Sequence, residues 1–106
     1  MKKSIFKVET TCPSIEMAEL IANTLVFEKL AACVQMGSEI RSVYTWKGKA
    51  YKEAEIPITI KTSGKSLERL RDRVSQLHSY ECPQWIITEV SASEPYADWV
   101  EENTVP

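Results

Sequence analysis

Residues 42–62 read SVYTWKGKAYKEAEIPITIKT and predict a long β-hairpin, which we expect to run from Cys33 to Thr62. The first half is rich in β-branched and aromatic residues, and Gly48 supplies the positive φ that a tight turn between two strands needs. The returning strand places three isoleucines on one face, Ile56, Ile58 and Ile60. Pro57 interrupts them and cannot donate a hydrogen bond to a neighbouring strand, so it predicts an edge position or a bulge.

The chain before this hairpin predicts a strand and a helix. Apolar and charged residues alternate over residues 5–10, which is typical of a half-buried strand. A helix is expected from Ser14 to about Ala31, because apolar residues recur there at helical spacing. Residues 33–46 then predict a strand that is interrupted near Gly37.

The chain after the hairpin predicts a helix, a strand and a final short helix. Apolar residues three or four positions apart predict a helix over residues 67–77. Residues 85–90 are apolar on both faces, which suits either a central strand or a strand covered by a partner subunit. The last helix is expected from Tyr96 to about Glu102, with Tyr96 and Trp99 as its anchors.

The order of these elements is β-α-β-β-α-β followed by a helix. It predicts an α+β fold, the ferredoxin-like sandwich, in a single domain of residues 1–106. A two-layer fold of this size has no room to bury all of its large aromatic side chains, among them Tyr44, Trp46, Tyr51, Trp85 and Trp99. Exposed aromatic residues on strands are typical of subunit interfaces, so we expect an oligomer.

Composition narrows the classes of function. The 106 residues carry a formal net charge of −2, with 43% hydrophobic and 26% charged residues, as in ordinary globular domains. This balance gives no indication of a nucleic-acid partner, and the most apolar long stretch contains too many polar residues to span a membrane. Three cysteines cannot all pair within one chain, and we expect a cytoplasmic protein.

Several motifs recur in the same order in one known family. They are Glu28-Lys29-Leu30-Ala31-Ala32-Cys33-Val34, Ser42-x-Tyr44-x-Trp46-x-Gly48, Ile60-Lys61-Thr62, His78-Ser79-Tyr80-x-x-Pro83 and Tyr96-x-x-Trp99. Over nearly the whole chain, their spacing resembles the CutA family of divalent-cation-tolerance proteins. The resemblance implies a ferredoxin-like subunit in a tight homotrimer, with hairpins that join sheets across subunits and a function in divalent-metal tolerance or response.

The sequence departs from the family pattern in three places. Ser79 stands where the family usually has proline, and Gln84 stands where it usually has glutamate. Ser93-Glu94-Pro95 replaces a glycine-containing approach to the last helix. These departures leave the expected fold intact. They weaken the transfer of any site that needs a carboxylate at position 84.

The resemblance also implies copper or another divalent metal as a ligand. Cys12 and His78 occupy positions that resemble metal ligands in the family, and a thiolate with an imidazole suits copper or zinc. Two ligands do not complete a site, and Glu81 or Cys82 could add a third. The structural alternative is that Cys12 ends a strand as a small residue and His78 is a cation at a helix C-terminus.

A second set of candidate site residues comprises Tyr44, Trp46, Lys61 and Tyr80. In the resembling family such residues line a cleft between subunits, where a lysine with aromatic rings could hold a small anion. Packing of a trimer and exposure on a sheet face explain the same four residues without a ligand.

The sequence favours a protein without enzymatic activity. His78 is the only histidine, so the cysteines have no evident base beside them. Residues 10–13 contain no arginine to cradle an anion after the first strand, as an acylphosphatase-type enzyme would need. Two classes remain: a non-enzymatic trimer of metal response or signalling, and a trimeric small-ligand sensor like the PII signalling proteins.

Overall fold

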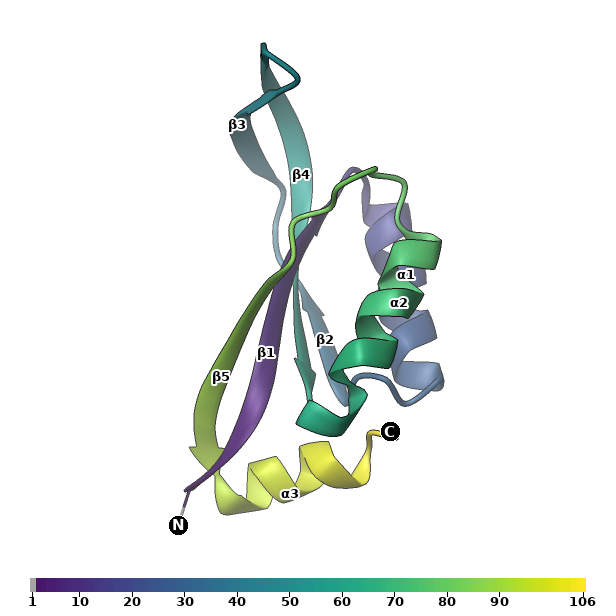
Figure 1. Ribbon diagram of the computed structural model, residues 1–106, viewed down its shortest axis with the longest axis vertical. Helices are drawn as coiled ribbons and strands as arrows, with labels where there is room; N and C mark the ends of the chain where they lie inside the picture. The colour runs from purple at the N-terminus through teal and green to yellow at the C-terminus, as the bar shows by residue number, and fades with distance from the viewer. Residues whose placement is uncertain (1) are drawn as a thin grey trace.

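A single antiparallel sheet organises the computed structural model, which describes residues 2–106 (Figure 1). Its strands are β1 (Lys2–Cys12), β2 (Cys33–Met36), β3 (Ile40–Trp46), β4 (Lys49–Thr62) and β5 (Ile86–Ser93). The order across the sheet is β2-β4-β1-β5, and β3 pairs with the first half of β4. This is the strand order of the ferredoxin-like fold, so the predicted fold class is confirmed.

The hairpin of β3 and β4 extends beyond the helices and gives the molecule its long axis of 46 Å (Figure 1). Its register places Tyr44 opposite Tyr51. Both residues of the turn have positive φ, 49° at Lys47 and 79° at Gly48. This is the backbone pattern of a type I′ turn, whose twist matches that of the two strands.

Pro57 lies within an inner strand, because β4 has β1 on one side and β2 on the other. The expected edge strand is therefore wrong, but the ladder is interrupted locally at this position. The Pro57 carbonyl accepts a 2.9 Å hydrogen bond from the Gly37 N–H, and Gly37 follows the last residue of β2. The N–H and C=O of one strand residue point to the same side of the strand. The backbone N–H that Pro57 lacks would therefore face the break between β2 and β3, where no donor is needed.

Two helices, α1 (Ile15–Phe27) and α2 (Leu67–Leu77), cover one face of the sheet, and a short 3₁₀ turn, η1 (Gly64–Ser66), precedes α2 (Figure 1). Helix α1 buries the apolar stripe expected from its spacing, which consists of Ala18, Ile21, Ala22 and Leu25. It ends at Phe27 rather than near Ala31, because Lys29 adopts φ 60°, the left-handed conformation that closes helices. Leu30 then turns into the core.

The third helix, α3 (Glu94–Glu102), crosses one end of the sheet (Figure 1). Its buried residues are Ala97 and Val100, which pack with Ile5 of β1. Tyr96 and Trp99, the expected anchors, are exposed, and their rings contact each other in a tilted arrangement with centroids 5.6 Å apart. That expectation was wrong because positions 97 and 100, not their larger neighbours, face the sheet.

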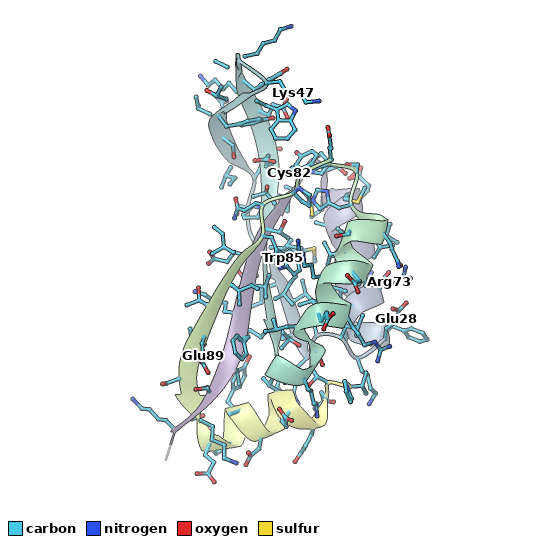
Figure 2. The ribbon with its side chains drawn as sticks, in the orientation of Figure 1. Glu28, Lys47, Arg73, Cys82, Trp85 and Glu89 are labelled. Atoms are coloured by element: carbon cyan, nitrogen blue, oxygen red, sulfur yellow. The ribbon has the colours of Figure 1, made fainter. Side chains whose placement is uncertain are left out.

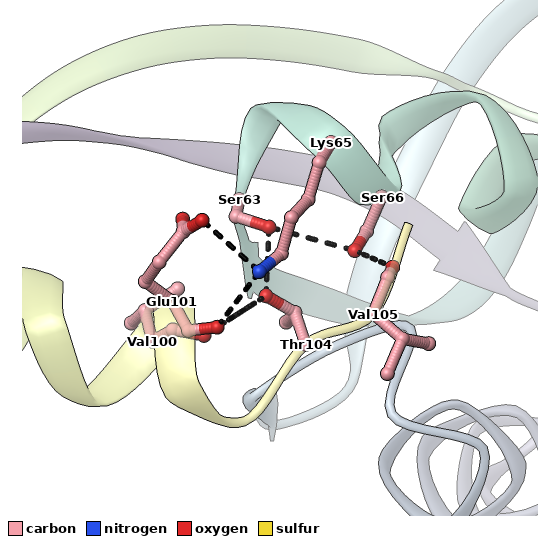
Figure 3. Close-up of polar contacts among 7 residues, drawn as sticks. All are labelled: Ser63, Lys65, Ser66, Val100, Glu101, Thr104 and Val105. Carbon is pink, nitrogen blue, oxygen red and sulfur yellow. Dashed lines mark hydrogen bonds and ion pairs between the residues drawn. The ribbon is translucent and has the colours of Figure 1, made fainter.

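The C-terminal residues tie α3 to the start of α2 (Figure 3). The hydroxyls of Ser63 and Thr104 lie 2.7 Å apart in a buried hydrogen bond, and Ser66 Oγ donates to the Val105 carbonyl. An ion pair of 3.0 Å between Lys65 and Glu101 lies on the surface beside them. These contacts join segments that are about forty residues apart.

Strand β5 forms one edge of the sheet, so the expectation of a central strand is wrong. Ile86 and Ile87 are 49% and 48% exposed on its two faces. The other alternative open from the sequence, a strand covered by a partner subunit, stays a prediction. Within residues 2–106, none of the helices combines the length and the apolarity that crossing a bilayer requires.

Candidate functional site

A cleft of about 760 Å³ lies between the β3–β4 hairpin and the loop that joins α2 to β5. In Figure 2, Lys47 marks the tip of the hairpin and Cys82 marks the loop. We call this space the hairpin cleft; it is lined by Thr11, Ser42, Val43, Tyr44, Trp46, Tyr51, Glu53, Glu55, Ser79, Tyr80, Glu81, Cys82 and Gln84.

The strand period places alternate hairpin residues in the hairpin cleft. Tyr44 lies opposite Tyr51, and Ser42 lies opposite Glu53, so both pairs share a face of the hairpin. The rings of Tyr44 and Tyr51 stack with centroids 5.5 Å apart and an interplanar angle of 19°. The hairpin therefore presents a ribbon of aromatic and acidic side chains to the loop.

Glu55 is the most enclosed charged group of the hairpin cleft, with 6% of its surface exposed. Its Oε2 accepts hydrogen bonds from the Tyr80 hydroxyl at 2.8 Å and from Thr11 Oγ1 at 3.1 Å. Burial alone raises the pKa of the Glu55 carboxyl, but hydrogen bonds from Ser42, Tyr80 and Thr11 outweigh it and hold that pKa below its ordinary value. The carboxylate is thus ionised at neutral pH.

His78 follows α2 and is almost completely buried. Its Nδ1 accepts from the Tyr80 N–H at 3.1 Å, so Nε2 carries the hydrogen and donates to the Thr11 carbonyl at 2.7 Å. Both ring nitrogens are therefore occupied in the neutral imidazole. Their role in this arrangement is to hold the loop at Tyr80 against the end of β1.

Cys12 ends β1 and is completely buried. Burial, with a smaller contribution from the nearby Glu55 carboxylate, raises the pKa of its thiol to about 11. A metal ligand must be a thiolate, and the imidazole must have a free nitrogen lone pair. Among residues 2–106, no three histidine, cysteine, aspartate or glutamate side chains come together as a metal-holding group. Cys12 and His78, as they stand, do not fit a copper ion.

Three of the four residues in the second predicted set meet in the hairpin cleft, namely Tyr44, Trp46 and Tyr80. Lys61 does not line it. It lies near the other end of β4, where its Nζ donates a 2.6 Å hydrogen bond to Gln35 Oε1. The expected pairing of a lysine with the aromatic rings is thus not made within the subunit.

The sequence reasoning missed the acidic half of the hairpin cleft. By strand alternation Glu55 belongs to the face opposite Ile56, Ile58 and Ile60, yet the structure encloses its side chain. A usable signal was present, because Tyr51, Glu53 and Glu55 recur at every second position and therefore share one strand face. Thr11 had no such signal, since it meets Glu55 across forty-four positions of sequence.

The chain is similar to known proteins along most of its length. A sequence model of the family described as CutA1 divalent ion tolerance protein matches residues 6–103. The divalent-cation tolerance protein CutA of Thermus thermophilus is 37% identical over 95 residues, which are 89% of this chain and 92% of that protein. The human protein CutA is 36% identical over 102 residues, which are 95% of this chain but only 57% of the human protein.

Solved structures agree with these sequence relatives. CutA1 from Thermus thermophilus superposes with a TM-score of 0.91 at 35% identity, covering 97% of this chain and 100% of that one. CutA1 from a psychrotrophic Shewanella superposes with a TM-score of 0.91 at 34% identity, covering 96% of each chain. The similarity extends over strands, helices and the projecting hairpin alike.

Proposed function

Because the chain belongs to the CutA1 divalent ion tolerance protein family, we propose that it serves divalent-cation tolerance as a non-enzymatic, cytoplasmic homotrimer with the hairpin cleft as its ligand site. The observation that supports this most strongly is the exposed apolar edge of the sheet. Ile86 and Ile87 on β5 are each about half exposed, and Val43 on the projecting hairpin is 74% exposed. An uncovered strand edge presents unpaired backbone N–H and C=O groups, and another chain can form hydrogen bonds with them.

Two separate strand edges are open for such pairing. Strand β5 bonds only to β1, and β3 bonds only to β4. Since the hairpin projects beyond its own subunit (Figure 1), it can reach the β5 edge of a neighbour. A cyclic arrangement of three identical contacts of this kind closes on itself and covers the β5 edge of every subunit.

The chemistry of the cysteines supports a function without catalysis. The Cys12 thiol is buried with its pKa raised to about 11, and both nitrogens of His78 are engaged. Nucleophilic catalysis by cysteine needs an accessible thiolate beside a base. We accordingly assign no catalytic residue and place no copper ion on Cys12 and His78.

A PII-like small-ligand sensor is the second candidate, and the hairpin cleft itself favours it. Convergent polar groups on aromatic walls are typical of small-molecule sites. However, the hairpin ends in a two-residue turn at Lys47 and Gly48, where such a sensor would need a long flexible loop. We therefore keep the ligand site and leave the loop-based signalling mechanism aside.

A pair of matched variants tests the assembly. Ile86→Lys places a charge on the β5 edge, whereas Leu20→Lys places one at an equally exposed position of α1, 50% against 49%. Light scattering at micromolar concentration is expected to show a trimer for the parent and for Leu20→Lys, and a monomer for Ile86→Lys. A monomeric parent would overturn the proposed assembly.

The same variants test the function in cells. In a bacterial strain that lacks its own member of the family, the parent and Leu20→Lys should restore growth in excess copper, zinc or cobalt. Ile86→Lys should fail to do so if the assembly is the active form. Restored growth by the monomeric variant would separate metal tolerance from assembly and contradict the proposal.

A further inference from the structure

The hairpin cleft has an unbalanced negative charge. Three carboxylates line it, those of Glu53, Glu55 and Glu81, and no lysine, arginine or histidine side chain is among the described residues that line it. Lys47, at the tip of the hairpin, forms a surface ion pair with Glu81 at 3.5 Å. Among residues 2–106, neither Glu53 nor Glu55 forms an ion pair. His78 lies close enough to act on the Glu55 charge, but both of its ring nitrogens are engaged in hydrogen bonds to other groups.

Glu55 places part of this negative charge in the interior of the protein. It is 6% exposed, and within residues 2–106 it forms no ion pair. Its hydrogen bonds from Tyr80 and Thr11 satisfy part of the carboxylate but leave its charge in place. Buried carboxylates in folded proteins are normally paired with a cation, so the site is electrostatically prepared for one.

The walls of the hairpin cleft decide which kind of cation fits. The aromatic rings of Tyr44, Trp46, Tyr51 and Tyr80 line it, and ring faces attract the diffuse positive charge of alkylammonium groups. A bare metal ion would need several converging ligands, and the part of the chain described here contains no such group of three. A volume of about 760 Å³ also suits a molecule rather than a single ion.

We propose that the hairpin cleft binds a small organic ammonium ion, with Glu55 as its counter-charge and the aromatic side chains as its walls. This inference rests on the proposed function, because it names a ligand class for the site assigned there. It adds the chemical class of the ligand, which a function in divalent-cation tolerance does not specify. The sequence suggested a small anion bound beside Lys61. Because Lys61 lies outside the hairpin cleft and glutamates line it, the expected ligand is a cation instead.

Calorimetric titration of the full chain with choline chloride and with butylammonium chloride tests the proposal. The control is 3,3-dimethyl-1-butanol, which has the shape of choline with a carbon atom in place of the charged nitrogen. We expect at least one ammonium probe to bind, and the neutral alcohol to bind at least about tenfold more weakly. Equal binding of the neutral alcohol, or no binding of either ammonium probe, would overturn the proposal.

Matched variants locate the binding. Glu55→Gln should weaken binding of the ammonium probe at least about tenfold, whereas Glu68→Gln, on the exposed side of α2, should leave it unchanged. Because Glu55 also holds Tyr80 and Thr11, Glu53→Gln provides a second variant at a more exposed carboxylate of the same cleft. Unchanged affinity in both cleft variants would overturn the proposal.

Three further outcomes keep this inference distinct from the proposed function. A trimer that restores metal tolerance but binds no ammonium probe would refute the ligand class and leave the proposed function standing. Zinc binding that is tighter than ammonium binding and is lost in Glu55→Gln would assign the cleft to a metal ion. A monomer that binds choline through Glu55 would support the ligand class while refuting the assembly.

Discussion

The phenolic hydroxyl of Tyr80 donates a 2.8 Å hydrogen bond to Oε2 of Glu55, and this contact joins the loop after α2 to the hairpin. Thr11, at the end of β1, donates to the same oxygen. Three segments that are distant in sequence therefore meet at one carboxylate. Burial, followed by the Glu55 carboxylate, raises the pKa of the Tyr80 hydroxyl, so the phenol remains a donor throughout the physiological range.

Tyr80→Phe removes one donor from the buried carboxylate. We expect the variant to lose about 1.5–3 kcal/mol of unfolding free energy, the usual magnitude for a hydrogen bond to a charged group. Urea denaturation at fixed protein concentration measures the change. Tyr96→Phe, at a tyrosine of α3 that is 37% exposed, is the matched control and should differ little from the parent.

The stabilisation from Glu55 should depend on pH in one direction. Burial works to raise its pKa, but the hydrogen bonds bring the pKa of the folded state below the ordinary value of 4.5. The unfolded chain then takes up the proton first, so this stabilisation is complete above the ordinary value and is lost as pH falls through the folded-state pKa. The stability difference between parent and Glu55→Gln should shrink between pH 7 and pH 3. A difference that stays constant over this range would show that the charge of Glu55 does not stabilise the fold.

The cysteines should differ sharply in reactivity. Cys82 is exposed, whereas Cys12 is fully buried and has a pKa raised to about 11, chiefly by burial. A thiol reagent such as Ellman's reagent should therefore modify Cys82 in the native protein at pH 8 and reach Cys12 only after unfolding. Cys82→Ser should remove the fast phase of the reaction. If Cys12→Ser instead lowers the number of thiols that react rapidly in the native protein, the burial of Cys12 is contradicted.

Gly37 and Pro57 should be coupled energetically. A Cβ at position 37 would lie 3.0 Å from Pro57 Cγ, so close that the proline ring would have to shift by a few tenths of an ångström. Gly37→Ala should therefore lower the unfolding free energy by about 1–3 kcal/mol, the usual effect of overpacking. Pro57→Ala removes the obstructing ring carbon, so in a double-mutant cycle the cost of Gly37→Ala should fall in the Pro57→Ala background. Additive effects would mean that the contact does not limit this position.

Local sequence was sufficient to predict most of the fold. The apolar stripe of α1 and the turn at Gly48 depend on spacing and on backbone preferences within a few residues. The element order then left few ways to arrange four sheet strands, and the ferredoxin-like order is the one observed. The resemblance to the CutA family, rather than local spacing, brought Tyr44, Trp46 and Tyr80 forward as candidate site residues, and the structure gathers them in one cleft.

Tertiary packing decided the features that no window of sequence contains. Tyr96 and Trp99 have larger apolar surfaces than Ala97, yet the way α3 meets the sheet buries the alanine and exposes the aromatic residues. Glu55 has the pattern of a solvent-facing strand residue. It is buried and ionised because Tyr80, 25 residues away, and Thr11, 44 residues away, supply hydrogen bonds that compensate for the loss of water. Local preferences act over one or two turns of chain, whereas the environment of a charge is set by whichever distant segments fold against it.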